Sequence, residues 1–404
     1  MTQNKAKKSV AIVGTMDSKG PEHLLLKELI ESMGHKTITI DIGTTKAHSI
    51  KPDFSVSELI ENQKIDRSFM IDSIVEKAKM IVLDLFRKGE VGAIISAGGG
   101  TGTFMATSIM KVLPLGVPKL MISTVASRDM SQVIATKDIT VMHSVVDFVG
   151  VNSISRVILE RAAGAVCGML SYDSKYEKRL PRVALTLFGF ITDAAENIKS
   201  ILEENGYEVI PFHANGTGGM AMEEMAGDGF FEGILDLATH ELVDDMFGGY
   251  CKGIGPQRLL NLDAANIPRL IIPGGLDSAV LEFDRGNVPI EYKERKIFFY
   301  DFRSAIRLTA YESRLLAETI SQRLNQSRNP LKILIPLKGW SEADREGDVL
   351  FHPESSEAFC ETLEKSLNPA IEIIKVQHHI NDKAFAVEAA GIMMSMIANN
   401  SVFD

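Results

Sequence analysis

The chain has 404 residues, of which 45% are hydrophobic and 24% are charged. These proportions are ordinary for a globular protein and exclude a disordered or fibrous chain, while the length favours two or three domains. The longest apolar runs, at 91–96 and 267–273, are far shorter than the roughly 20 residues of a membrane-spanning helix. Three widely spaced cysteines, Cys167, Cys251 and Cys360, suggest neither a disulfide framework nor a zinc site. We therefore expect a soluble, cytoplasmic protein with no membrane association.

The charge is unevenly distributed along the chain. The net charge is −10, which argues against nucleic-acid binding as the main role. Up to residue 180 there are 23 Lys and Arg against 19 Asp and Glu, a balance of +4, and the remainder has 20 against 34, a balance of −14. An anionic ligand is therefore expected to favour the first half.

The first half alternates apolar strand patterns with amphipathic helix patterns. Helices are expected after Pro21, at 69–88, at 104–112 and at 151–170, with a long polar insertion between 44 and 67. Strands are expected at 8–14, 36–43, 91–100, 117–122 and 139–142. This alternation predicts a largely parallel sheet covered by helices on both faces.

The second half restarts the same rhythm after the polar segment 172–180. Strands are expected at 182–188, 207–212, 233–237, 268–273, 296–301, 331–336 and 371–376. Helices are expected at 193–205, 219–226, 304–324, 355–366 and 383–398. We predict two α/β, Rossmann-like domains, residues 1–178 binding a nucleotide and residues 179–404 forming the second domain.

The strongest local signal is the glycine-rich run at 97–103, AGGGTGT. It follows a strand and opens a helix, so its bare backbone and the helix dipole favour a phosphate or carboxylate over a turn needed only for packing. Neither a P-loop nor a G-x-G-x-x-G fingerprint is present. Asp41 could hold a ribose or cap a loop, and Lys19 could reach a phosphate or be solvated. The residues expected to bind the cofactor are Gly14, Thr15, Asp17, Lys19, Asp41, Gly98, Gly99, Gly100, Thr101, Gly102, Thr103 and Ser123.

In the second half, polar residues again follow predicted strands. His213 could act as an acid or base, or be structural. The acids Asp236, Glu241, Asp244 and Asp277 could hold a divalent cation, or cap helices. The catalytic candidates are His213, Glu241, Asp244, Lys338 and His379. The substrate-binding candidates are Asn215, Gly216, Thr217, Gly218, Gly274 and Asn381.

Several of these stretches together resemble one family. The segments AIVGTMDSKG, ISAGGGTGT, FHANGTGGMAMEEM, LDLATHELVDDMFGG, PGGLD and HINDKAFA are similar to the widespread bacterial and fungal family that resembles the ATP-binding N-terminal region of the tomato mosaic virus resistance protein. The similarity spans essentially the whole chain. It departs at 300–309, where a His-Asn-Pro stretch and a Thr-Leu-Met-Arg-Thr segment are usual, and at Asn215, where Thr is usual.

The resemblance implies ATP in the first domain, a homodimer and a TIM-barrel partner protein. We therefore expect an ATP-binding enzyme that acts on a small acidic metabolite in the interdomain cleft, with Mg²⁺ as a candidate second cofactor. One alternative is a nucleotide-sensing module that works through a partner such as a TIM-barrel protein. Another is a sugar-acid or carboxylate enzyme whose glycine loop holds the substrate's own phosphate or carboxylate, without ATP.

Overall fold

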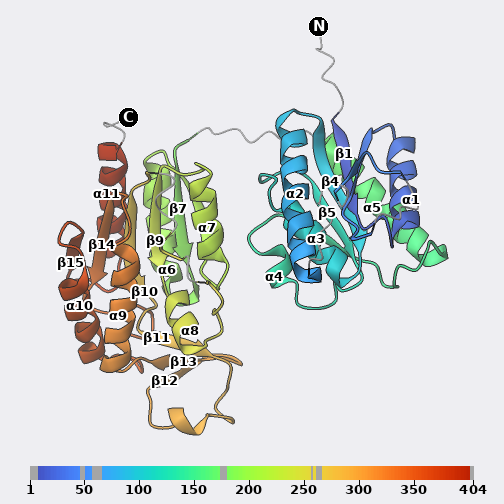
Figure 1. Ribbon diagram of the computed structural model, residues 1–404. Helices are drawn as coiled ribbons and strands as arrows, with labels where there is room; N and C mark the ends of the chain where they lie inside the picture. The colour runs from blue at the N-terminus through green and yellow to red at the C-terminus, as the bar shows by residue number, and fades with distance from the viewer. Residues whose placement is uncertain are drawn as a thin grey trace. The chain divides into compact units, whose positions relative to one another are not determined.

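Figure 1 shows the computed structural model, which describes residues 8–45, 51–56, 66–172, 180–255, 258–260 and 266–400. The chain divides into two compact units, residues 1–176 and 177–404. The domain boundary expected between 178 and 179 falls at a segment outside the described residues. Within the described ranges, no helix is long and apolar enough to cross a membrane.

The N-terminal unit is built on a six-stranded sheet in which every strand pair is parallel, with the order β3-β2-β1-β4-β5-β6. Its strands are β1 Ser9–Gly14, β2 Thr37–Asp41, β3 Phe54–Ser55, β4 Val91–Gly98, β5 Lys119–Ser123 and β6 Thr140–His143. Its helices are α1 Gly20–Ser32, α2 Arg67–Arg87, α3 Gly100–Met110, α4 Ser131–Ile134 and α5 Ser153–Ser171.

Both faces of this sheet are covered, as the alternation of strands and helices predicts. Along β1, Val10 and Ile12 pack with residues of α1 and α5. The alternate residues Ala11 and Val13 pack with residues of α2 and α3. Successive side chains of a strand point to opposite faces, so this fully buried strand has helices on both sides.

The C-terminal unit has a second six-stranded parallel sheet, with the order β15-β14-β10-β9-β7-β8, and a small antiparallel sheet, β11-β13-β12. The strands are β7 Arg182–Leu187, β8 Glu208–His213, β9 Gly233–Ala238, β10 Arg269–Gly274, β11 Ser278–Leu281, β12 Ile297–Phe299, β13 Ser304–Arg307, β14 Leu331–Pro336 and β15 Glu372–Val376. The helices are α6 Thr192–Glu204, α7 Gly218–Gly227, α8 Glu241–Phe247, α9 Ala310–Leu324, α10 Pro353–Ser366 and α11 Lys383–Asn400, with single 3₁₀ turns at Gly189–Ile191 and Ile290–Tyr292.

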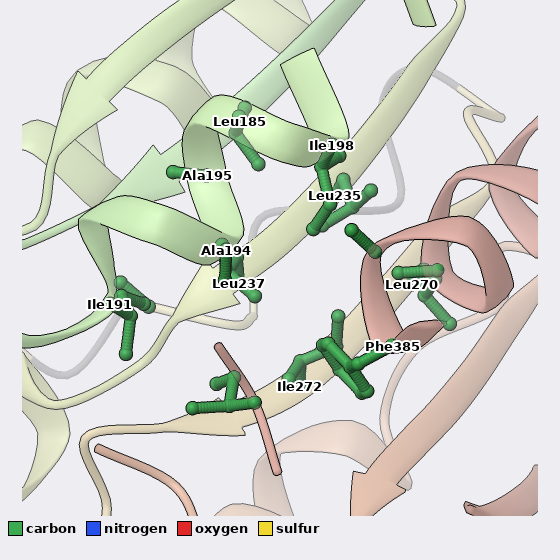
Figure 2. Packing of buried hydrophobic residues seen from close by; sticks show 14 of the residues in the cluster. Leu185, Ile191, Ala194, Ala195, Ile198, Leu235, Leu237, Leu270, Ile272 and Phe385 are labelled. Atoms are coloured by element: carbon green, nitrogen blue, oxygen red, sulfur yellow. The ribbon is translucent and has the colours of Figure 1, made fainter. Parts of the chain in front are cut away.

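The largest core of this unit lies between the sheet and the pair of helices α6 and α11. Figure 2 shows Leu235, Leu270 and Ile272 of the central strands together with Ile198 of α6 and Phe385 of α11. The opposite face of the sheet carries a second apolar cluster with residues of α8, α9 and α10. Two largely parallel sheets with helices on both faces confirm the predicted α/β class.

The structure corrects three details of the predicted elements. The helix expected from residue 104 begins at Gly100, so the glycine run forms its first turn. The helix expected at 304–324 is interrupted, because 304–307 is strand β13 and α9 begins only after Thr309, which caps it in a reciprocal capping box. Helix α8 and strand β11 are absent from the predicted elements, since both are too short, at seven and four residues, to show a clear period.

The two large sheets share one strand order. If the two-residue strand β3 is left aside, each sheet runs from its second strand to its first, then third, fourth and fifth, and the C-terminal sheet continues to a sixth. The order reverses between β1 and β4 in the N-terminal unit, and between β7 and β9 in the C-terminal unit. Ligands of open α/β sheets bind beyond the carboxyl ends of the strands at such a reversal. The loops that follow these four strands are therefore the places to look for sites.

Candidate functional site

Gly14, at the end of β1, is glycine because a buried imidazole occupies the space beside it. A Cβ at this position would lie 1.9 Å from Nε2 of His23. The ring is wedged between two strand ends, with Nδ1 2.6 Å from the Lys19 carbonyl oxygen and Nε2 3.4 Å from the Ala97 amide nitrogen. Burial lowers the pKa of His23, so the ring is neutral at physiological pH. Gly14 and His23 therefore lie at the N-terminal switch point, which is the reversal of strand order between β1 and β4.

Gly99, Gly100, Thr101 and Gly102, which we call the glycine site, lie at the other side of that switch point. A Cβ at Gly100 or Gly102 would meet no atom within 4 Å, and at Gly99 it would meet only the Thr124 hydroxyl, 3.8 Å away. None of these three glycines has a positive φ. Neither packing nor backbone conformation therefore requires glycine at these positions.

The glycine site forms the start of α3, whose N-cap residue Gly99 makes no side-chain capping hydrogen bond. The first amide groups of a helix have no intrahelical acceptor, and this end of the helix carries partial positive charge. Thr101 is exposed beside them. Open space above bare backbone, uncapped amides and a hydroxyl together form a surface suited to an anion.

Other predicted cofactor residues are engaged within the protein. The buried Asp41 carboxylate accepts hydrogen bonds from the amides of Met16 and Gly43, at 2.8 and 2.9 Å. Asp17 accepts hydrogen bonds from the Thr44 and Thr45 amides. Asp41 and Asp17 thus fix the loops after β1 and β2, and direct contact of Asp41 with a ribose stays a prediction.

Lys19, Thr103 and Ser123 are likewise committed to internal contacts. The Lys19 ammonium donates to the Phe148 carbonyl oxygen. The Thr103 and Ser123 hydroxyls, both buried, lie 2.7 Å apart and join α3 to the end of β5. Gly98 packs against Gly102, since a Cβ there would lie 3.3 Å from the Gly102 Cα. In this arrangement the most exposed part of the predicted site is the segment from Gly99 to Gly102 at the start of α3, and Thr15, Asp17 and Lys19 are partly exposed.

The C-terminal unit holds a buried network of two arginines and three carboxylates. Arg258 donates to both oxygens of Asp236, at 2.7 and 2.8 Å, and also to Glu223 and Glu241. Arg269 donates to Glu223 and Asp236. The arginines hold the pKa of Asp236 well below its usual range despite the burial of that carboxyl. This ion network occupies Asp236 and Glu241, two of the acids expected to hold a cation or do catalysis.

Beside this network lie His240, Asp244 and Cys251, which we call the His240 cluster. One potential ligand atom from each of the three lies within 4.8 Å of the others. The side chains come from the end of β9, from α8 and from the loop after α8, and only 3%, 0% and 6% of their surfaces are exposed. The His240 ring stacks on Phe188, with ring centres 4.0 Å apart. Phe188 follows β7 and His240 follows β9, so the cluster sits at the second switch point.

The polar groups of the His240 cluster are partly satisfied. Asp244 accepts hydrogen bonds from the Val280 and Cys251 amides, at 2.8 and 2.9 Å. Nδ1 of His240 has no hydrogen-bond partner among the described residues. Burial raises the pKa of Asp244 to about 6 and that of Cys251 to about 12, and it lowers the pKa of His240 to about 3.

Three polar side chains interact electrostatically with members of the His240 cluster. His213 is exposed, and its charge contributes to the lowered pKa of His240. Arg303 lies 5.2 Å from the Tyr300 ring centre, pairs with Asp301 and contributes to the electrostatics of Cys251. Burial is the main cause of the raised pKa of Tyr300, with the Asp244 charge adding to it. The departure from the family pattern at 300–309 therefore falls beside this cluster.

The remaining catalytic and cation candidates lie elsewhere in the unit. Asp277 accepts from the Ser341 hydroxyl, 2.8 Å away, and faces Arg307, separately from the other acids. His379 is buried, with Nε2 3.0 Å from the Ser341 carbonyl oxygen and Nδ1 3.0 Å from Arg345. Lys338 is exposed, and no side-chain contact recorded for the described residues ties it to these groups. The four predicted acids therefore do not converge on one cation.

The predicted substrate-binding residues divide in a similar way. Asn215 and Thr217 are exposed on the loop after β8, where Gly216 has φ +99° and donates its amide to Glu241. Gly218 and Gly274 are required by packing, since a Cβ would lie 1.8 Å from the His213 carbonyl oxygen and 2.1 Å from that of Leu237. The Asn381 side chain donates to the Phe190 carbonyl oxygen and accepts from the Ala194 amide, so it fixes the start of α6.

Sequence reasoning missed His240, Cys251 and Arg258 as site residues. The usual sequence signs of a metal site are His-x-x-x-His and Cys-x-x-Cys spacings, whereas this cluster mixes three residue types. The spacing of His240 and Asp244, one helical turn apart at the start of a helix, is the signal that could have found it. Arg258 lies in a polar loop, where nothing in the sequence indicates burial.

The fold and its two switch points define a two-unit, doubly wound α/β protein. The chain belongs to the family described as Uncharacterised protein family (UPF0261): residues 8–175 match its N-terminal domain and residues 180–397 its C-terminal domain. A UPF0261 protein of Clostridium tetani is 35% identical over 405 residues, covering 96% of this chain and 99% of the relative.

A plant protein and a solved structure also match. The ToMV resistance protein Tm-1(GCR237) of Solanum lycopersicum is 33% identical over 306 residues, covering 73% of this chain and 40% of the plant protein. The UDP-GlcNAc 2-epimerase of Methanocaldococcus jannaschii is 11% identical and covers 96% of this chain and 92% of its own, with a TM-score of 0.24. Likeness at that level carries no argument about function.

Proposed function

We propose that the N-terminal unit binds the phosphates of a nucleotide, ATP in the first instance, at the glycine site. The observation that carries this proposal is that Gly100 and Gly102 have no internal reason to be glycine. Glycine in a helix costs roughly 0.5–1 kcal/mol of stability relative to alanine. Two such residues in one helical turn, facing open space, are accounted for by a ligand that must approach the backbone closely.

The position and charge of the glycine site support a phosphate in particular. It lies at the strand-order reversal, where doubly wound sheets bind their ligands. The half of the chain that contains it has a net charge of +4 within a protein of −10. The choice of ATP rests on the resemblance to an ATP-binding region, and Mg²⁺ would enter with the nucleotide.

The finer part of the proposal is an enzyme that uses the bound nucleotide on a small acidic metabolite. Backbone amides and hydroxyls hold phosphates but do not by themselves transfer them, so the reacting groups must come from elsewhere in the chain. His213, Asp244 and Arg303 around the second switch point offer an acid or base, a carboxylate and an anion partner. The homodimer and the TIM-barrel partner stay predictions.

Calorimetric titration of the full chain with ATP, with and without Mg²⁺, tests nucleotide binding. Gly100→Asp places a negative charge in the first turn of α3, where it favours the helix but repels a phosphate. Gly164→Asp is the matched control, since Gly164 is exposed on α5 of the same unit and a Cβ there meets nothing within 4 Å. We expect Gly100→Asp to lower ATP affinity at least tenfold while Gly164→Asp leaves it unchanged. Equal affinity in the two variants would refute the site.

Phosphate release separates the enzyme from its alternatives. ATP consumption that depends on an added small acid supports the enzyme, and loss of that turnover in His213→Ala places chemistry in the C-terminal unit. Tight ATP binding without release of phosphate, whichever small acid is added, favours the nucleotide-sensing module. Saturable binding of a phosphorylated or carboxylated sugar acid, with none of ATP, favours the enzyme that does not use ATP.

A further inference from the structure

We propose that the His240 cluster is a zinc site, in which His240, Asp244 and Cys251 bind one Zn²⁺ ion. This proposal is independent of nucleotide binding in the N-terminal unit. Imidazole nitrogen, carboxylate oxygen and thiolate sulfur are the three donor types that zinc takes in proteins. A mixed set with one sulfur disfavours Mg²⁺ and Ca²⁺, which prefer oxygen ligands only.

The geometry needs little adjustment. Donor atoms that share a tetrahedral zinc ion lie roughly 3.3–3.8 Å apart, given zinc–ligand distances of about 2.0–2.3 Å. In the structure the three candidate atoms already lie within 4.8 Å of one another. Rotation of the side chains by less than about 1.5 Å at their tips would therefore complete the set.

An unsatisfied buried nitrogen is the second observation. His240 is 3% exposed, and no described residue offers a hydrogen-bond partner to its Nδ1. Leaving a buried polar atom unpaired costs about 1–3 kcal/mol, so such atoms are uncommon unless they serve a purpose. Phe188 holds the ring from one face, which fixes its orientation without using its nitrogens.

The charge around the cluster also favours a cation. The described groups that share this buried region are the carboxylates of Glu223, Asp236, Glu241 and Asp244 and the guanidiniums of Arg258 and Arg269. If all are ionised, four negative and two positive charges leave a balance of −2. Burying unbalanced charge is expensive, and one Zn²⁺ ion, which binds Cys251 as a thiolate and releases its proton to solvent, would reduce the balance from −2 to −1.

The three donors leave one coordination position open. Zinc with three protein ligands and a fourth position for water or substrate is typical of catalytic rather than structural sites. His213, Tyr300 and Arg303 are exposed or partly exposed polar side chains that interact electrostatically with the cluster. A ligand with an oxygen donor and a negative charge, such as a carboxylate, would suit both the zinc and Arg303.

Cobalt substitution tests the proposal directly. The full chain is stripped with a chelator and titrated with Co²⁺ alone, because a cysteine thiolate bound to Co²⁺ gives a near-ultraviolet charge-transfer band. We expect one Co²⁺ per chain with this band, and displacement of the Co²⁺ by Zn²⁺. Cys251→Ser should abolish the band. Cys360→Ser is the matched control, since Cys360 is also a buried free cysteine of the same unit, and it should retain the band.

A second variant guards against loss of folding. His240→Phe keeps an aromatic ring against Phe188 and removes both nitrogens, so it should fold without binding Co²⁺. Its thermal stability should be unaffected by Zn²⁺, whereas that of the wild-type chain should rise. Absence of stoichiometric Co²⁺ binding in the wild-type chain would overturn the proposal, as would a charge-transfer band that persists in Cys251→Ser or disappears in Cys360→Ser.

Discussion

Gly102→Ala should make the protein more stable and a poorer binder of ATP. Gly102 is the third residue of α3, it has a negative φ, and a Cβ at this position meets no atom within 4 Å. Alanine is better than glycine in a helix by roughly 0.5–1 kcal/mol, partly because it restricts the unfolded chain. For a unit of this size such a gain raises the unfolding midpoint by about 1–4 °C.

The effect on binding should have the opposite sign. The methyl group projects into the space from which a phosphate would reach the amides of α3, so it displaces the anion from its closest approach. A tenfold loss of affinity corresponds to about 1.4 kcal/mol, and we expect at least that much. Differential scanning calorimetry without ligand and titration calorimetry with ATP measure the two quantities on the same preparation.

Gly164→Ala is the control for Gly102→Ala. Gly164 lies within α5, is exposed, and has the same open surroundings, so its replacement should give a similar gain in stability with no change in affinity. If both variants gain stability and bind ATP like the wild-type chain, glycine at 102 does not serve a ligand. If Gly102→Ala loses stability, the surroundings of the glycine site are not open as described.

Three further predictions concern stability. Gly14→Ala would push a methyl group into the His23 ring and should lower the free energy of unfolding by about 3 kcal/mol or more, as measured by urea denaturation; a loss below 1 kcal/mol would contradict the packing. Arg258→Met should cost about 3–5 kcal/mol in the same assay, because it leaves the buried Glu223 and Asp236 carboxylates with Arg269 alone and removes the guanidinium that pairs with Glu241. A neutral effect would show that the network is not buried. Folding lowers the pKa of His23, so near and below pH 6.5 the unfolded chain binds more protons than the folded chain, and the free energy of unfolding should fall as the pH drops through that value. His23→Gln should reduce the slope of the free energy of unfolding against pH by up to about 1.4 kcal/mol per pH unit. An unchanged slope would argue against a buried neutral ring.

The sequence predicted those parts of the fold that depend on periodicity. Strand 91–98 stands out as a long apolar run that is buried at every position, and helix α2 stands out because its apolar residues recur at helical spacing. Strand β13 is not predictable in this way, since a strand of four residues is too short to show alternation, and the sequence pattern of the following helix runs into it although Thr309 caps α9. Short elements are fixed by tertiary partners that the local sequence does not reveal.

The candidate sites show the same division. The glycine site was predictable, because it depends on one continuous segment that follows a strand. The His240 cluster combines the end of β9, helix α8 and the loop after it, so only the fold shows that His240 and Cys251 meet. The sequence also suggested that Asp236 and Asp244 bind one cation together. In the structure Arg258 pairs with Asp236, whereas Asp244 forms no ion pair with a described residue.

The Arg258 network has a consequence for how the C-terminal unit responds to solution conditions. Mobile ions screen charges that are exposed to solvent, but they do not enter a fully buried site. The ion pairs of Arg258 with residues of α7, α8 and β9 should therefore keep their strength as the salt concentration rises. Surface ion pairs such as Lys199–Glu203 should weaken under the same conditions. A single side chain thus ties three separate elements beneath the second switch point, and it makes their alignment depend on one residue rather than on ionic strength.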